Sequence, residues 1–129
     1  MYRLPGRLPS LSDIVRRSVP ALLRAGYAHD PSALTDASTV TPNLLTRNAF
    51  TWLIEGTPRT LGFPSVIPGA GSWLIIATID ATGGYTISLD GSYKELANSA
   101  GFVGTADVVN FVELISDGTS IWANVQQAA

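Results

Sequence analysis

The side chains that could do chemistry in this sequence are first of all its carboxylates. Hydrolysis of a glycosidic bond, for example, requires two facing acids. Asp80, Asp90, Asp107 and Asp117 all lie at expected turns or strand ends. Aspartate is common at such positions because its side chain hydrogen-bonds the nearby backbone. We therefore assign these four residues to turns rather than to catalysis.

Glu113 is a different case, because it lies inside an expected strand, where it alternates with Phe111 and Ile115. If these two neighbours face the core, Glu113 shares their side of the sheet. It then lies either at the edge of the sheet or across an interface. We favour a salt-bridged residue at the sheet edge.

Nucleophilic, metal and nucleotide chemistry find no support in the sequence. There is no cysteine, which excludes thiolate zinc sites and cysteine nucleophiles. His29 is the only histidine and stands beside Asp30-Pro31, and no G-x-S-x-G motif is present. The glycines at 69–71 and 83–84 match neither a P-loop nor a dinucleotide-binding motif. We expect no catalytic residue, metal site, cofactor or small-molecule substrate, and hence no enzyme.

Aromatic residues offer a further kind of site. Trp52, Trp73 and Trp122, with Tyr85 and Tyr93, could form a stacking platform for sugars. Aromatic residues in strands more often lie in the core or at a subunit interface. We expect the three tryptophans to pack in this way, with a subunit interface as their candidate role.

The charges divide the chain into a basic arm and an acidic body. Residues 1–29 carry five arginines and one aspartate, a net charge of +4, whereas residues 30–129 carry three basic and nine acidic residues, a net charge of −6. Only 14% of all residues are charged, against about 25% in a typical soluble domain. This low charge density suggests that much of the surface faces protein. Nucleic acid is a less favoured partner of the arm than an acidic protein surface.

The arm and its connection occupy residues 1–45. Two prolines and a glycine favour an extended conformation over residues 1–10. Residues 11–25 place their apolar side chains on one helical face, with a kink expected at Pro20. Residues 26–45 read as a linker, or as a loop laid over a surface. No apolar run approaches the roughly 20 residues that span a bilayer, so we expect no membrane contact.

From residue 46 the apolar pattern alternates with a period of two, which is typical of strands. We expect strands at 48–54, 58–63, 73–80, 85–89, 107–116 and 119–125, and the strand at 73–80, the most apolar, in the centre. The ATGG turn (81–84) predicts one hairpin, and Asp117-Gly118 predicts another. The longer connection at 90–106 has room for one short strand. The chain is thus predicted to be mainly β, an antiparallel β-sandwich or jelly-roll-like domain at 46–129 preceded by the arm with its short kinked helix.

The segments ATGGYTISLDGSYKE (81–95) and DVVNFVELISDGTSIWANV (107–125) resemble the C-terminal segment of tailed-bacteriophage virion proteins. Those proteins include capsid decoration, head-fibre and tail-fibre components that end in a small β-sandwich. The resemblance covers residues 46–125. It implies a non-enzymatic structural role, usually as trimers or other symmetric copies.

We expect a capsid decoration, or cement, protein, because the chain is short, begins at Met1 and has no repetitive shaft. Its location would be the capsid surface of the virion, after synthesis in the host cytoplasm, and its partners would be the major capsid protein and copies of itself in a homotrimer. The alternative is a tail, fibre or neck module that binds host glycan through exposed aromatic residues and the loops at 64–72 and 90–106. The residues predicted to bind the capsid are those of the arm: Arg3, Leu4, Arg7, Leu8, Leu11, Ile14, Val15, Arg16, Arg17, Leu22, Leu23 and Arg24.

Overall fold

The computed structural model describes residues 30–128, and this part of the chain is built from strands without a helix. The mainly β prediction is confirmed. The predicted arm and kinked helix, with all twelve residues predicted to bind the capsid, lie outside the described residues, as does His29. The strands are β1 (Ser32–Leu34), β2 (Thr39–Val40), β3 (Ala49–Ile54), β4 (Arg59–Leu61), β5 (Ala70–Ile79), β6 (Ile87–Leu89), β7 (Lys94–Glu95), β8 (Val109–Asp117) and β9 (Ile121–Gln127).

The strands wind into a parallel β-solenoid of about three turns. Each turn contains two strands, one from each of two sheets. The six-stranded sheet has the order β1-β3-β5-β8-β9-β7, and the three-stranded sheet has the order β2-β4-β6. Pairing is parallel between β1, β3 and β5, and also between β2, β4 and β6. The predicted antiparallel sandwich or jelly roll is therefore wrong. Period-two alternation is the same in parallel and antiparallel strands, so it could not separate the two folds.

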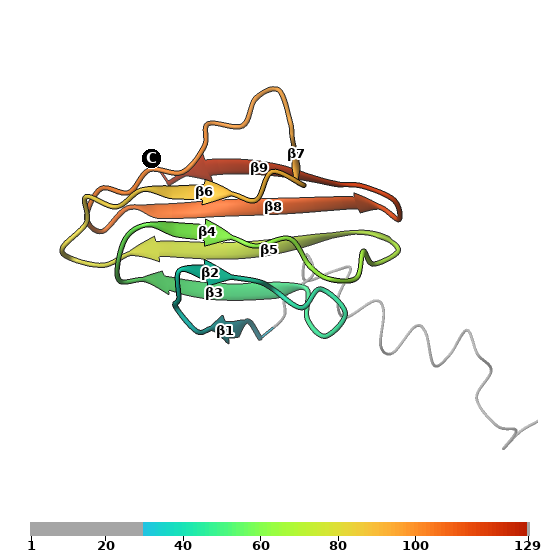
Figure 1. Cartoon of the computed structure of the whole chain (residues 1–129), viewed down its shortest axis with the longest axis horizontal. Helices are drawn as coiled ribbons and strands as arrows, with labels where there is room; N and C mark the ends of the chain where they lie inside the picture. The colour runs from blue at the N-terminus through green and yellow to red at the C-terminus, as the bar shows by residue number, and fades with distance from the viewer. Residues whose placement is uncertain (1–29, 129) are drawn as a thin grey trace, which may run out of the picture. The chain divides into compact units, whose positions relative to one another are not determined.

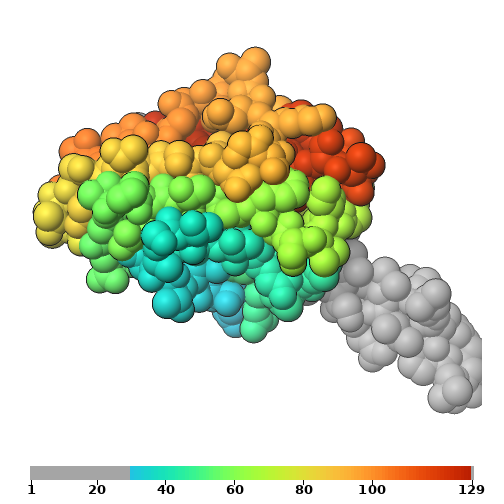
Figure 2. Space-filling model, in the orientation of Figure 1, coloured from blue at the N-terminus to red at the C-terminus, as the bar shows by residue number. Residues whose placement is uncertain are grey.

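The two sheets lie one over the other, with β2, β4 and β6 in front of the longer strands (Figure 1). Figure 2 shows the same face as adjacent bands, which follow the chain from cyan through green to yellow. The core lies between the sheets. Along β3 and β5, alternate residues such as Trp52, Ile54, Ile75 and Ile79 are buried there, while the residues between them point to the other side of the six-stranded sheet. We call that side the outer face.

The hairpin predicted at Asp117-Gly118 is confirmed, since β8 and β9 pair antiparallel on either side of it. Gly118 has a φ of 92°, a value that glycine adopts without steric cost. The central position expected for residues 73–80 is also correct, because β5 lies between β3 and β8 in the six-stranded sheet.

The hairpin predicted at residues 81–84 does not form. Gly83 and Gly84 do have positive φ values of 64° and 78°, but the turn carries the chain into the other sheet, where β6 pairs in parallel with β4. The short strand expected within residues 90–106 is present as β7, which pairs with β9.

Residues 31–45, expected to be linker, contribute β1 and β2 to the first solenoid turn. β1 pairs with β3, and β2 pairs with β4, so the apolar residues of this segment have a surface to pack against. Val40 is buried in the shared core, and Leu34 packs against it.

Candidate functional site

Each solenoid turn changes sheet at two places, and the two places differ in chemistry. The aspartate end, as we name it, comprises the segments that follow β1, β3 and β5: residues 35–38, 55–58 and 80–86. The groove end comprises the segments that follow β2 and β4: residues 41–48 and 62–69. Because parallel strands share a direction, the segments of each end stack on one another.

Asp36 organises the aspartate end. Its carboxylate accepts hydrogen bonds from Trp52 Nε1 at 2.8 Å, from the Glu55 amide at 3.1 Å and from Arg59 Nη2 at 2.9 Å. The Arg59 contact is the one ion pair that residues 30–128 contain. Burial alone would raise the pKa of Asp36, but the hydrogen bonds from Arg59, Trp52 and Glu55 outweigh it and lower that pKa. Asp36 in turn raises the pKa of Arg59. The carboxylate is thus fully engaged as a structural acceptor.

Asp80 closes the third segment of this end, which follows β5, in the same way. It accepts from the amides of Thr82 and Gly83 at 3.0 and 3.2 Å, and from the Tyr85 hydroxyl at 3.1 Å. Desolvation opposes ionisation, yet these bonds, that of Gly83 first, leave the pKa of Asp80 below its usual value. The assignment of Asp80 to a turn agrees with these bonds. Nowhere in residues 30–128 do three or more acidic or histidine side chains gather to hold a metal ion.

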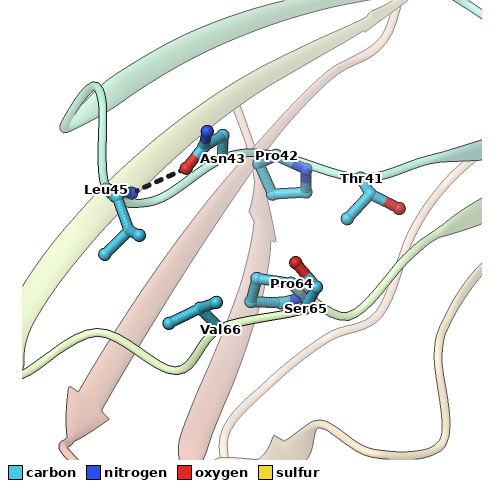
Figure 3. Close-up of a pocket in the computed structure, with 7 residues that line it drawn as sticks. All are labelled: Thr41, Pro42, Asn43, Leu45, Pro64, Ser65 and Val66. Atoms are coloured by element: carbon cyan, nitrogen blue, oxygen red, sulfur yellow. Dashed lines mark hydrogen bonds between the residues drawn. The ribbon is translucent and has the colours of Figure 1, made fainter.

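The groove end carries an open groove of about 310 Å³ between its two loops. We call it the loop groove; Figure 3 shows one loop on either side of it, with Leu45 and Val66 facing the same space. Leu45 is 62% exposed and Val66 is 54% exposed. None of the lining residues is charged: they are Thr41, Pro42, Asn43, Leu45, Pro64, Ser65 and Val66.

Three buried donors hold the two loops in place from the core side. Trp73 Nε1 donates to the Leu44 carbonyl at 2.9 Å, in the first loop. The Tyr93 hydroxyl and Ser116 Oγ donate to the carbonyls of Gly62 and Pro68, at 2.7 and 3.1 Å, at the two ends of the second loop. Burial, followed by the charge of Asp90, raises the pKa of Tyr93, so its hydroxyl remains a donor. The walls of the groove are therefore preorganised.

Gly62 allows the two loops to approach each other. A Cβ at this position would run into the side chain of Thr41. The Gly62 amide also donates to the Val40 carbonyl at 2.8 Å, which joins the two solenoid turns directly below the groove. The close approach and the shape of the groove depend on the missing side chain.

The family model described as "Putative phage tail fibre C-terminal domain" matches residues 40–121, most of the solenoid. The chain belongs to this family. No curated protein and no solved structure matches the chain. The protein is therefore a phage virion structural protein of tail-fibre type, and the tail replaces the expected capsid surface as its location.

The matched region of the tail-fibre domain includes both loops of the groove and all of the aspartate end beyond residue 40. The predicted contact with a major capsid protein concerned the arm, which lies outside the described residues, so it stays a prediction. In residues 30–128 there is no helix long and apolar enough to cross a membrane.

The three tryptophans predicted at a subunit interface lie in different places in the tail-fibre domain. Trp52 and Trp73 are buried on the core side, where each donates a hydrogen bond to a neighbouring segment. Trp122 lies half-buried on the outer face, with Lys94 Nζ 5.2 Å from its ring centroid. The structure does not bring the three together, and their role between subunits stays a prediction.

Glu113 does not occupy the expected edge. It lies on β8 in the interior of the six-stranded sheet, paired with Leu74 on one side and Asn124 on the other. Phe111 and Ile115 point with it to the outer face rather than to the core. No salt bridge joins Glu113 to any other residue in the described part of the chain.

Asp90 and Asp117 also bond the backbone of their turns, and Asp107 lies in a turn with a φ of 63°. Asp117 accepts from the amides of Thr119 and Ser120, and these bonds, that of Ser120 first, lower its pKa. Asp90 accepts from the Ser92 amide at 2.9 Å.

Sequence reasoning missed the loop groove, because its walls come from residues 41–45 and 64–66, and no sequence pattern relates these two segments. The available signal was two apolar pairs, Leu44-Leu45 and Val66-Ile67, each within three residues of a proline.

Proposed function

We propose that this tail-fibre domain contacts the host and binds a neutral saccharide of the cell surface in the loop groove. The observation that carries the proposal is the pair of exposed aliphatic side chains, Leu45 and Val66, which face one groove between two fixed loops. Singly exposed aliphatic side chains are common, but exposed apolar side chains gathered in one groove mark a ligand-binding site.

The polar lining suits a ligand rich in hydroxyl groups. Thr41 and Ser65 each offer a hydroxyl that can donate and accept, and Asn43 offers an amide. Pro42 and Pro64 present rigid apolar surfaces, against which the C–H face of a sugar ring can pack. The absence of charged side chains among the lining residues favours a neutral ligand, because a buried ion would have no partner there.

The mode of recognition differs from the aromatic platform considered from the sequence. The Trp52, Trp73 and Tyr93 rings are buried, so apolar contact in the groove comes from proline and aliphatic side chains. We expect weak binding by a single groove, and tight adsorption only when several copies engage the same surface.

The test is binding of the full chain to an array of bacterial surface saccharides. We expect neutral saccharides to bind, and we expect Val66→Asp or Leu45→Asp to weaken that binding by about tenfold or more, since covering one aliphatic side chain contributes about 1.5–3 kcal/mol. The matched control is Val103→Asp, which alters another exposed aliphatic side chain outside the groove.

Two results would contradict the proposal. One is a full chain that binds no saccharide and adsorbs to no host cell. The other is saccharide binding that both groove variants retain but that Trp122→Ala abolishes, because the site would then lie on the outer face.

A further inference from the structure

The outer face of the six-stranded sheet leaves apolar side chains without a partner in the described part of the chain. Three of the six large hydrophobic residues that are most exposed in residues 30–128 lie on it: Leu53 (50%), Leu74 (37%) and Phe111 (39%). They are not scattered. Ile76, at the centre, pairs with Thr51 on one side and with Phe111 on the other. Leu74 lies two residues before it on the same face of β5, and Leu53 is its diagonal neighbour on β3.

The charge on this face differs from that of the domain as a whole. Residues 30–129 carry a net charge of −6, yet the outward-pointing residues of β3, β5 and β8 include one charged side chain in the interior of the sheet, Glu113. Depletion of charge around aromatic and aliphatic side chains marks the centre of a protein interface rather than a solvated face.

The face carries both a projection and a recess. Phe111 projects from β8, on one side of β5. On the other side of β5 lies a hollow of about 340 Å³, with Thr51, Leu53 and Ile76 among its lining residues. β1, the three-residue edge strand, contributes Ala33 and Leu34 to the lining of the same hollow.

We infer that copies of this chain associate through the outer face, with β5 of each copy nearest the symmetry axis. In this arrangement Phe111 of one copy enters the hollow beside Leu53 of the next. A closed symmetric assembly joins complementary patches of identical copies, and a projection and a recess on opposite sides of one strand supply such patches. The uncharged side chains of β5, namely Leu74, Ile76 and Thr78, then meet at the axis, and each Glu113 lies off it. This inference does not depend on ligand binding in the loop groove.

The experiment is sedimentation of the full chain over a range of concentrations. We expect an oligomer, whose mass gives the number of copies and so tests the expected trimer. Leu74→Asp and Phe111→Asp should each weaken the association constant by about 30-fold or more, as for central interface residues. Val103→Asp, at a residue exposed to a similar degree (36%) but away from this face, should leave it unchanged.

Thr51→Phe distinguishes the proposed fit of Phe111 into the hollow from nonspecific apolar association. This change adds apolar area to the outer face but fills the hollow, so it should weaken the association. A merely adhesive face would associate more strongly. Urea unfolding of each variant shows whether the fold is intact, and Val66→Asp should assemble normally.

The proposal is overturned if the full chain is a monomer at every concentration, whatever else covers the face in the virion. It is also overturned if Leu74→Asp, correctly folded, assembles like the unchanged chain, or if Thr51→Phe strengthens the assembly.

Discussion

The two ends of the solenoid perform the same geometric task with different chemistry. At the aspartate end, turns are closed by Asp36 and Asp80, which gather amide, indole, hydroxyl and guanidinium donors. At the groove end, loop carbonyls accept from the buried donors Trp73, Tyr93 and Ser116. The carboxylates of Asp36 and Asp80 use their hydrogen-bond acceptor capacity to close turns. The loops of the groove end are instead bonded through their backbone carbonyls to donors in the core, so their outward side chains remain available to a ligand. The candidate site therefore lies at the groove end.

The largest effect should come from breaking the support of the groove end. Trp73→Ala removes a buried indole and the donor to Leu44, and should lower the free energy of unfolding by about 3–5 kcal/mol. It should also abolish saccharide binding, because the first loop loses its anchor. Urea unfolding and array binding measure the two effects.

Trp73→Phe is the matched control for this change. It keeps most of the packing but leaves the Leu44 carbonyl without its donor, at a cost of about 1–3 kcal/mol. If Trp73→Ala were no more destabilising than this variant, the packing of the indole would not support the loop.

A smaller effect is expected from the aspartate end. Asp36→Ala should lower the free energy of unfolding by about 1–3 kcal/mol, because Trp52 Nε1 would be left without an acceptor in a side chain that is 1% exposed. Saccharide binding should persist. Glu95→Ala, at an exposed position on β7, should change stability by no more than about 0.5 kcal/mol. Loss of binding in a folded Asp36→Ala protein would mean that the two ends are coupled.

The smallest effect is a difference in pH dependence between the indole protons of Trp52 and Trp73 in the same molecule. The pKa of Asp36 is lower when folded than its ordinary value of 3.8, so its contribution to stability is complete above about pH 4 and is lost as the pH falls through the folded pKa. In an NMR titration, the Trp52 indole proton should shift with a midpoint below 3.8. The Trp73 indole proton, bonded to a carbonyl, should not move until the protein unfolds. A shared midpoint would contradict independent closure of the two ends.

The sequence was informative where a local pattern determines the outcome. Alternation located β3 and β5, and Asp117-Gly118 located the β8–β9 hairpin. The sequence could not show that the strands wind into a solenoid, because the solenoid turns differ in length. Ser32 pairs with Phe50, and Phe50 pairs with Ile75, offsets of 18 and 25 residues, so no fixed period is visible. Likewise, glycines with positive φ at 83 and 84 are compatible with a hairpin and with a turn into another sheet.

The candidate site was less predictable than the fold, because it depends on contacts between distant segments. Leu45 and Val66 share a groove only because Gly62 lets the second loop approach Thr41. The sequence predicts glycan contact for the loop at 64–72 in the alternative reading, but it predicts a linker for the segment that forms the other wall of the groove. The sequence also could not show that Phe111 and Glu113 point to the outer face, because this follows from the pairing of β8 with β5.

The most direct test of the account is an amide NMR map of the full chain titrated with the neutral saccharide that binds best on the array. We predict that the shifts concentrate at Thr41–Leu45 and Ser65–Val66, and that Val66→Asp removes them while Asp36→Ala does not. Shifts concentrated at residues 80–86, or on the outer face, would contradict the assignment of binding to the groove end.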